Sequence, residues 1–79
     1  MKEKLKQFFD TDFHYVEVGL KREPDRVYRR SEIINYALQR ALGALEVAQI
    51  FGLDFETCEW MFEEYKARLE VARNAVSSN

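Results

Sequence analysis

The sequence predicts a mainly α fold, in which an antiparallel helical hairpin carries a short N-terminal helix and a strand or small β-hairpin. Apolar residues recur at helical spacing over residues 31–52 and again over residues 55–76, and only a few residues separate the two runs. Residues 13–20 instead alternate apolar, β-branched and aromatic residues in the way that strands do. A chain of 79 residues accommodates one small domain, so we assign residues 1–79 to a single domain.

The first long helix is predicted over residues 31–52. Ser31 is a good N-cap, and Gly52 suits the left-handed residue that follows many helices. Its apolar arc is wider than an ordinary surface helix buries, and one stripe of it is alanine, which lets another helix approach closely. We therefore predict a homo-oligomer, in its simplest form a dimer. Its predicted interface consists of Ala37, Ala41, Ala44, Ala48 and Trp60.

The second long helix is predicted over residues 55–76, after a short connection in which Asp54 serves as the N-cap. Trp60 projects away from the main apolar face of this helix. Two interpretations of Trp60 stay open, because it could pack beneath the N-terminal strand or anchor a subunit contact. The residues of the apolar face are Phe55, Cys58, Met61, Phe62, Tyr65, Leu69, Ala72 and Val76.

The first thirty residues are predicted to be mixed. Residues 2–9 form a short helix, a break follows at residues 10–12, and residues 13–20 form the strand. Pro24 lies in the turn that comes next. Residues 26–30 either return as an edge strand or belong to a helix that Pro24 begins and that continues into the long helix, and we favour the hairpin.

Composition argues against an enzyme. The chain has one cysteine and one histidine, which excludes a disulfide framework and a cysteine-based zinc site. Cys58 falls on an apolar face, His14 has no second ligand nearby, and the glutamates of residues 56–70 read as a solvated face. We expect no catalytic residue, metal or cofactor. No apolar run approaches the roughly 18 residues of a membrane span, so we expect a cytoplasmic protein.

Basic residues concentrate just before the first long helix. Arginine is well suited to hold phosphate or carboxylate groups, so this cluster is a candidate contact for an anionic partner, although pairing with the chain's own acidic helix is the plainer interpretation. Residues 44–64 also resemble a helix-turn-helix in spacing, but the helix that would read DNA carries glutamates that phosphate repels. A nucleic-acid-associated regulator is therefore the alternative function. The cluster consists of Lys21, Arg22, Arg26, Arg29 and Arg30.

Two further stretches, residues 28–43 and residues 62–69, resemble small uncharacterised proteins encoded in phage and prophage genomes. The resemblance covers about half of the chain. It implies no defined activity, but it implies a context in which such proteins bind a host protein or a regulatory complex. Together with the composition, this predicts a non-enzymatic protein-interaction or oligomerisation module.

Overall fold

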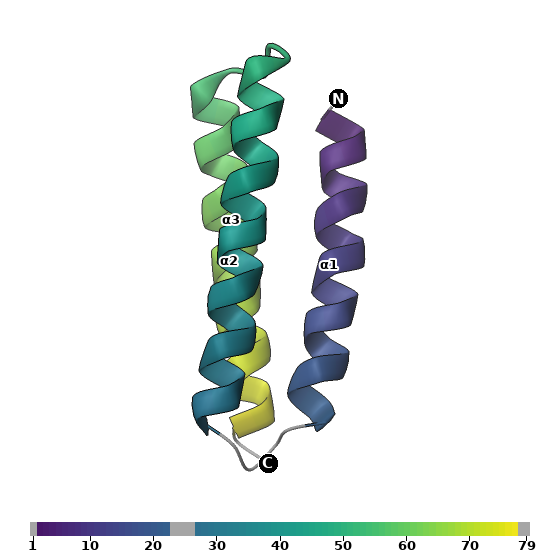
Figure 1. Ribbon diagram of the computed structural model, residues 1–79, viewed down its shortest axis with the longest axis vertical. Coiled ribbons are helices and arrows are strands. Elements are labelled where there is room, and N and C mark those ends of the chain that lie inside the picture. The colour runs from purple at the N-terminus through teal and green to yellow at the C-terminus, as the bar shows by residue number, and fades with distance from the viewer. Residues whose placement is uncertain (1, 23–26, 78–79) are drawn as a thin grey trace.

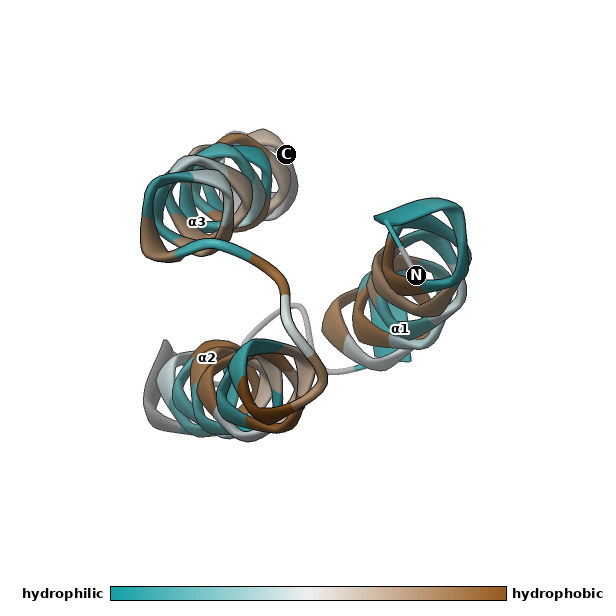
Figure 2. Ribbon diagram, turned by 90° about the horizontal axis from the view of Figure 1, so that it is seen from above, coloured by the Kyte–Doolittle hydropathy of each residue, from teal (hydrophilic) through white to brown (hydrophobic). Residues whose placement is uncertain are grey.

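The computed structural model describes residues 2–22 and 27–77, with side chains described in the second range from residue 29 to residue 75. These residues form three helices, α1 (Lys2–Arg22), α2 (Val27–Ile50) and α3 (Phe55–Ser77). Each helix runs antiparallel to the one before it in the chain (Figure 1). Seen from above, the three helices stand at the corners of a triangle (Figure 2). The turn between α2 and α3 extends beyond the N-terminal end of α1 (Figure 1).

The predicted strand over residues 13–20 and the predicted break at residues 10–12 are wrong, because α1 is one continuous helix. Leu5, Phe9, Val16 and Leu20 are its buried residues, and they recur at helical spacing. The same apolar residues that alternate over residues 13–20 also fall three and four positions apart. The longer helical period therefore prevails, since it lets α1 bury a single stripe against α2 and α3.

The predicted edge strand over residues 26–30 is also wrong where the structure describes it, because residues 27–30 form the first turn of α2. The first long helix thus begins at Val27 rather than at Ser31. Residues 23–26, with the predicted turn at Pro24, lie outside the described residues. Of the two alternatives for this stretch, the helical one holds for residues 27–30.

The helical hairpin is confirmed, and so are the signals that end one helix and begin the next. Gly52 has a positive φ of 105°. Its amide donates to the Gln49 carbonyl at 3.0 Å, and the Leu53 amide donates to the Ala48 carbonyl at 3.0 Å, which is the Schellman pattern. Asp54 then caps α3 by accepting a hydrogen bond from the Thr57 amide at 2.9 Å.

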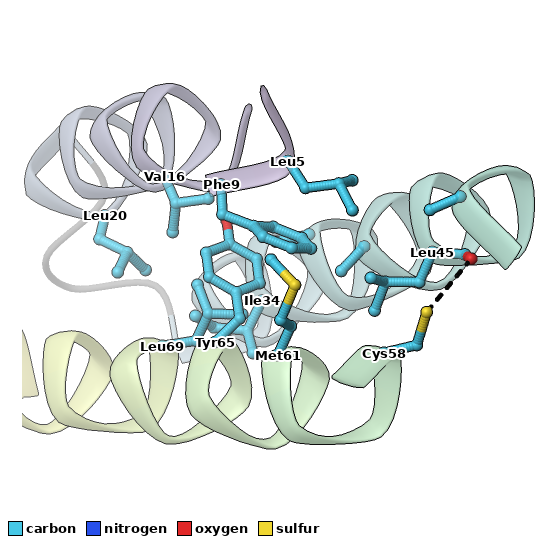
Figure 3. Close-up of a cluster of buried hydrophobic side chains, with 13 residues drawn as sticks. Leu5, Phe9, Val16, Leu20, Ile34, Leu45, Cys58, Met61, Tyr65 and Leu69 are labelled. Atoms are coloured by element: carbon cyan, nitrogen blue, oxygen red, sulfur yellow. Dashed lines mark hydrogen bonds between the residues drawn. The ribbon is translucent and has the colours of Figure 1, made fainter. Parts of the chain in front are cut away.

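The core lies between the three helices, along the axis of the bundle (Figure 3). The rings of Phe9 and Tyr65 lie 4.8 Å apart between α1 and α3. Leu20 and Leu69 are fully buried. The thiol of Cys58 points toward the Leu45 carbonyl oxygen at 3.8 Å, so α2 and α3 also meet near their turn (Figure 3).

The alanine stripe of α2 faces this core. Ala37, Ala41 and Ala48 are buried and Ala44 is partly buried against the other helices of the same chain. The predicted close approach of a second helix is thus made within the chain, since small residues on α2 let α1 and α3 pack against it. A second copy would reach these alanines only by opening the bundle. Among the described residues, no helix combines the length and the hydropathy needed to cross a membrane.

Candidate interaction face

Two contacts show which side of α1 lies against α2. Asp12 on α1 accepts hydrogen bonds from the guanidinium of Arg40 on α2 at 2.7 and 3.3 Å. A Cβ added to Gly19 would lie 3.5 Å from a side chain of α2. Phe8 and Tyr15 lie on this same side of α1, because positions 8, 12, 15 and 19 are separated by four, three and four residues. Both aromatic side chains therefore stand beside α2 at the surface.

The outward side of α2 continues this apolar surface. Tyr36, Val47 and Ile50 fall within an arc of about 60° at 100° per residue, and that arc points away from the alanine stripe. They are 56%, 52% and 81% exposed, and Phe51, directly after α2, is 70% exposed. Six of the ten exposed large apolar side chains that the structure describes belong to this surface. We call it the α1–α2 apolar face, and its residues are Phe8, Tyr15, Tyr36, Val47, Ile50 and Phe51.

A polar network tied to all three helices lies at the edge of this face. Asp12 on α1 accepts hydrogen bonds from Arg40 on α2 and, at 2.5 Å, from the hydroxyl of Tyr65 on α3. The side chain of Asp12 is only 11% exposed. Burial raises the pKa of Tyr65, and the hydrogen bond to the Asp12 carboxylate raises it further. The network fixes the register of the helices and pairs the charge of Arg40.

Trp60, predicted as an interface residue, lies on a different surface. It lines a groove of about 290 Å³ between α1 and α3, and it is 57% exposed. The ammonium nitrogen of Lys2 lies 5.6 Å from the centre of its ring. At the end of the groove away from Trp60, Arg68 pairs with Asp10 at 2.8 Å. Trp60 therefore contacts α1 through Lys2, far from the residues 13–20 that were read as a strand, while much of its ring faces solvent.

The predicted basic cluster is divided by the fold. Lys21 and Arg22 are exposed in the last turn of α1, where their charge suits the negative end of the helix dipole. Arg29 is exposed and lies 3.5 Å from Glu32 on the same helix. Arg30 points inward, and Arg26 lies outside the described residues. The described part of the chain thus presents three of the five predicted cations to solvent.

Arg30 is a charged residue that lies among the apolar residues of the core. It is only 6% exposed, and its Nε atom has no hydrogen-bond partner. It lies on the same side of α2 as Ala37 and Ala41, seven and eleven residues further along. Its methylene stem therefore occupies a core position, and its role as a contact for an anionic partner stays a prediction.

The segment that resembles a helix-turn-helix has the connection of such a motif but a different geometry. In that motif the two helices cross at about 90–120°. Here α2 and α3 lie alongside each other and run antiparallel (Figure 1). Glu56 and Glu59 are exposed at the start of α3, where the motif would meet phosphate. The hairpin geometry agrees with the interpretation of this segment as a helix-hairpin turn.

The remaining candidates for chemistry are separated in space. Cys58 is buried, and His14 is exposed beside Tyr15, with the two ring centres 5.9 Å apart. Hydrogen bonds from Thr57 to the Asp54 carboxylate lower the pKa of Asp54, which follows from its role as a helix cap. Within the described residues, no three His, Cys, Asp or Glu side chains form a group that could hold a metal ion.

The geometry above can be set against known proteins. No family model, curated protein or solved structure matches this chain. The resemblance to small phage-encoded proteins and the binding context that it implies stay predictions.

Sequence reasoning did not identify the α1–α2 apolar face, because it assigned the interface to the alanine stripe and Trp60. The apolar pattern of the first long helix already groups Tyr36 and Val47 with Phe51 on one stripe. Tyr15 was missed as a member of the face because residues 13–20 were read as a strand, and Phe8 was missed because the predicted helix over residues 2–9 was separated from them by a break. The heptad-like spacing of residues 5, 9, 13, 16 and 20 was the signal that could have placed both on one continuous helix.

Proposed function

We propose that this chain is a non-enzymatic protein-interaction module that acts through the α1–α2 apolar face. The observation that carries the proposal is the concentration of exposed aromatic and aliphatic side chains on one side of a small bundle. Contiguous exposed apolar patches of more than a few hundred Å² are rare on monomeric proteins and mark interaction sites. Tyrosine and phenylalanine are also among the residues that interfaces favour.

The framework beneath the face supports this proposal. The face is carried by two long helices rather than by loops, and the Asp12–Arg40 pair holds those helices in register. The backbone of a rigid element loses little conformational entropy when a partner binds. The face is thus preorganised for binding.

Site-specific photo-crosslinking tests the proposal. A photoreactive phenylalanine analogue is placed at Val47, inside the face, and in a matched control at Val71, an exposed valine of α3 that is outside it. We expect cells that produce the Val47 variant to yield a discrete covalent protein adduct after irradiation, and the Val71 variant to yield none. Equal labelling at both positions, or none at Val47, would contradict an interaction through this face.

A further inference from the structure

We propose that the partner on the α1–α2 apolar face is a second copy of this chain, which docks with α2 antiparallel to α2 and with Gly43 at the two-fold axis. This inference rests on the proposed function and specifies the partner. It replaces the buried alanine stripe with the exposed side of α2, which lies about 120° around the helix from that stripe, as the contact between copies.

The spacing along α2 is symmetric about Gly43. Tyr36 lies seven residues before Gly43 and Ile50 seven residues after it, while Gln39 and Val47 lie four residues to either side. A two-fold axis at Gly43 therefore brings Tyr36 of each copy level with Ile50 of the other. Positions separated by three and four residues form one continuous seam on a helix, as helix pairs require.

Gly43 itself permits the closest approach at the crossing point. It is exposed, and a Cβ added to it would meet no atom within 4 Å. Two helices with small residues at their contact approach to about 8 Å between axes, near the short end of the usual range. A glycine at the axis therefore brings the two α2 backbones together while the larger side chains pack on either side.

The α1 side chains of the face fit the same arrangement. Because Asp12 lies opposite Arg40 and the helices are antiparallel, Phe8 stands at the level of Ala44, one residue from Gly43, and Tyr15 at the level of Ala37, one residue from Tyr36. Each copy therefore has a tyrosine end and an end formed by Ile50 and Phe51. The two-fold axis places the tyrosine end of one copy against the other end of its partner, and the tyrosine hydroxyls can stay at the rim.

The area and the charge of the face both suit a second copy. Its six side chains are 40–81% exposed. Because one aromatic side chain carries about 150–250 Å², they offer on the order of 700 Å² per copy, close to the roughly 800 Å² that each partner buries in a standard interface. None of the six is charged, and the Arg40 charge at the edge is paired with Asp12. The face therefore neither repels its own copy nor selects a partner of strong charge.

Two measurements on the purified chain test this inference. Light scattering should give twice the 9.4 kDa mass of one chain. In an oxidising buffer, Gly43→Cys should form an intermolecular disulfide, because residues at a two-fold helix crossing come within the Cα separation that disulfides need. The control is Ala67→Cys on the exposed side of α3, which should stay reduced under the same conditions. Circular dichroism should be measured on both variants, and we expect both to remain helical.

The outcomes distinguish the inference from the proposed function. A monomeric mass at millimolar chain concentration, or a disulfide that forms as fast at position 67 as at position 43, overturns the antiparallel dimer. If the chain is monomeric while the photoreactive Val47 variant captures a different protein, the second copy is the wrong partner and the interaction function stands. If position 47 captures nothing at all, the interaction function fails as well.

Discussion

The two sides of α2 have similar apolar character and different surroundings. On the inner side, Ala37, Ala41 and Ala48 are buried by α1 and α3. On the outer side, Tyr36, Val47 and Ile50 are at least half exposed. The inner side has small residues, against which α1 and α3 pack closely. The outer side has large residues that no helix of the chain covers. The wide apolar arc of α2 therefore serves two contacts, one within the chain and one, as we propose, between chains.

The largest effect is expected on the inner side. Ala41→Glu places a carboxylate where no solvent reaches, which should lower the free energy of unfolding by about 3 kcal/mol or more. Urea unfolding followed by circular dichroism measures this loss. Ala67→Glu, at an exposed alanine of α3, is the control and should change the free energy by less than about 0.5 kcal/mol. Similar effects at both positions would remove the distinction between the two sides of α2.

The hydrogen bonds that join Asp12 to Arg40 and Tyr65 lie at the boundary between the two sides of α2. Tyr65→Phe keeps the ring against Phe9 and removes the hydrogen bond to the Asp12 carboxylate, which should cost about 2 kcal/mol near neutral pH. A control variant, Tyr36→Phe, removes an exposed hydroxyl and should cost little. Full stability in the Tyr65→Phe variant would show that the network does not hold the helices together.

The stabilisation that the Tyr65 hydroxyl provides should decrease at high pH. The pKa of Tyr65 is raised in the folded state. The Tyr65 hydroxyl therefore stabilises the fold fully below its unfolded pKa of about 10, and this stabilisation is lost as the pH rises through the folded pKa. The stability advantage of the natural chain over Tyr65→Phe should therefore shrink by about 1.4 kcal/mol per pH unit above pH 10. Urea unfolding of the natural chain and of Tyr65→Phe at pH 8 and at pH 11 measures this difference in stability. An advantage that is unchanged at pH 11 would contradict the assignment.

The smallest effect is expected at Arg30, the polar residue on the inner side. Methionine retains an unbranched apolar stem and removes a buried guanidinium whose Nε has no partner. Replacing a buried charged side chain by an apolar one of similar shape is often neutral or stabilising, so Arg30→Met should leave the midpoint of thermal unfolding unchanged or raise it. Arg29→Met, at an exposed site, is the control. A loss of more than about 2 kcal/mol would mean that the guanidinium of Arg30 contributes a stabilising contact.

The helical hairpin could be predicted from the sequence because its signals are local. Gly52 and Asp54 each act on residues a few positions away, and the apolar pattern of α3 places Met61 and Leu69 inside the core as expected. The N-terminal half of the chain could not be predicted in the same way. Over residues 13–20 the helical and strand patterns share the same apolar residues, and only packing against α2 and α3 decides between them.

The candidate site depended on contacts that are distant in sequence. Asp12 meets Arg40 and Tyr65 across 28 and 53 residues, and neither pairing leaves a local signal. The sequence showed that α2 has more apolar surface than one helix covers. It could not show which side the chain's own helices occupy, and the alanine stripe was therefore assigned to an oligomer contact although it lies in the core.

The most direct test of the account compares two valines that are both exposed, Val47 on the outer side of α2 and Val71 on α3. Sedimentation equilibrium and circular dichroism are measured for Val47→Lys and Val71→Lys. We expect Val47→Lys to weaken self-association by about 100-fold, because it buries a charge in the interface. Both variants should keep their helices, and Val71→Lys should still associate as the natural chain does. Unfolding of Val47→Lys, or equal association of the two variants, would contradict a dimer through the outer side of α2.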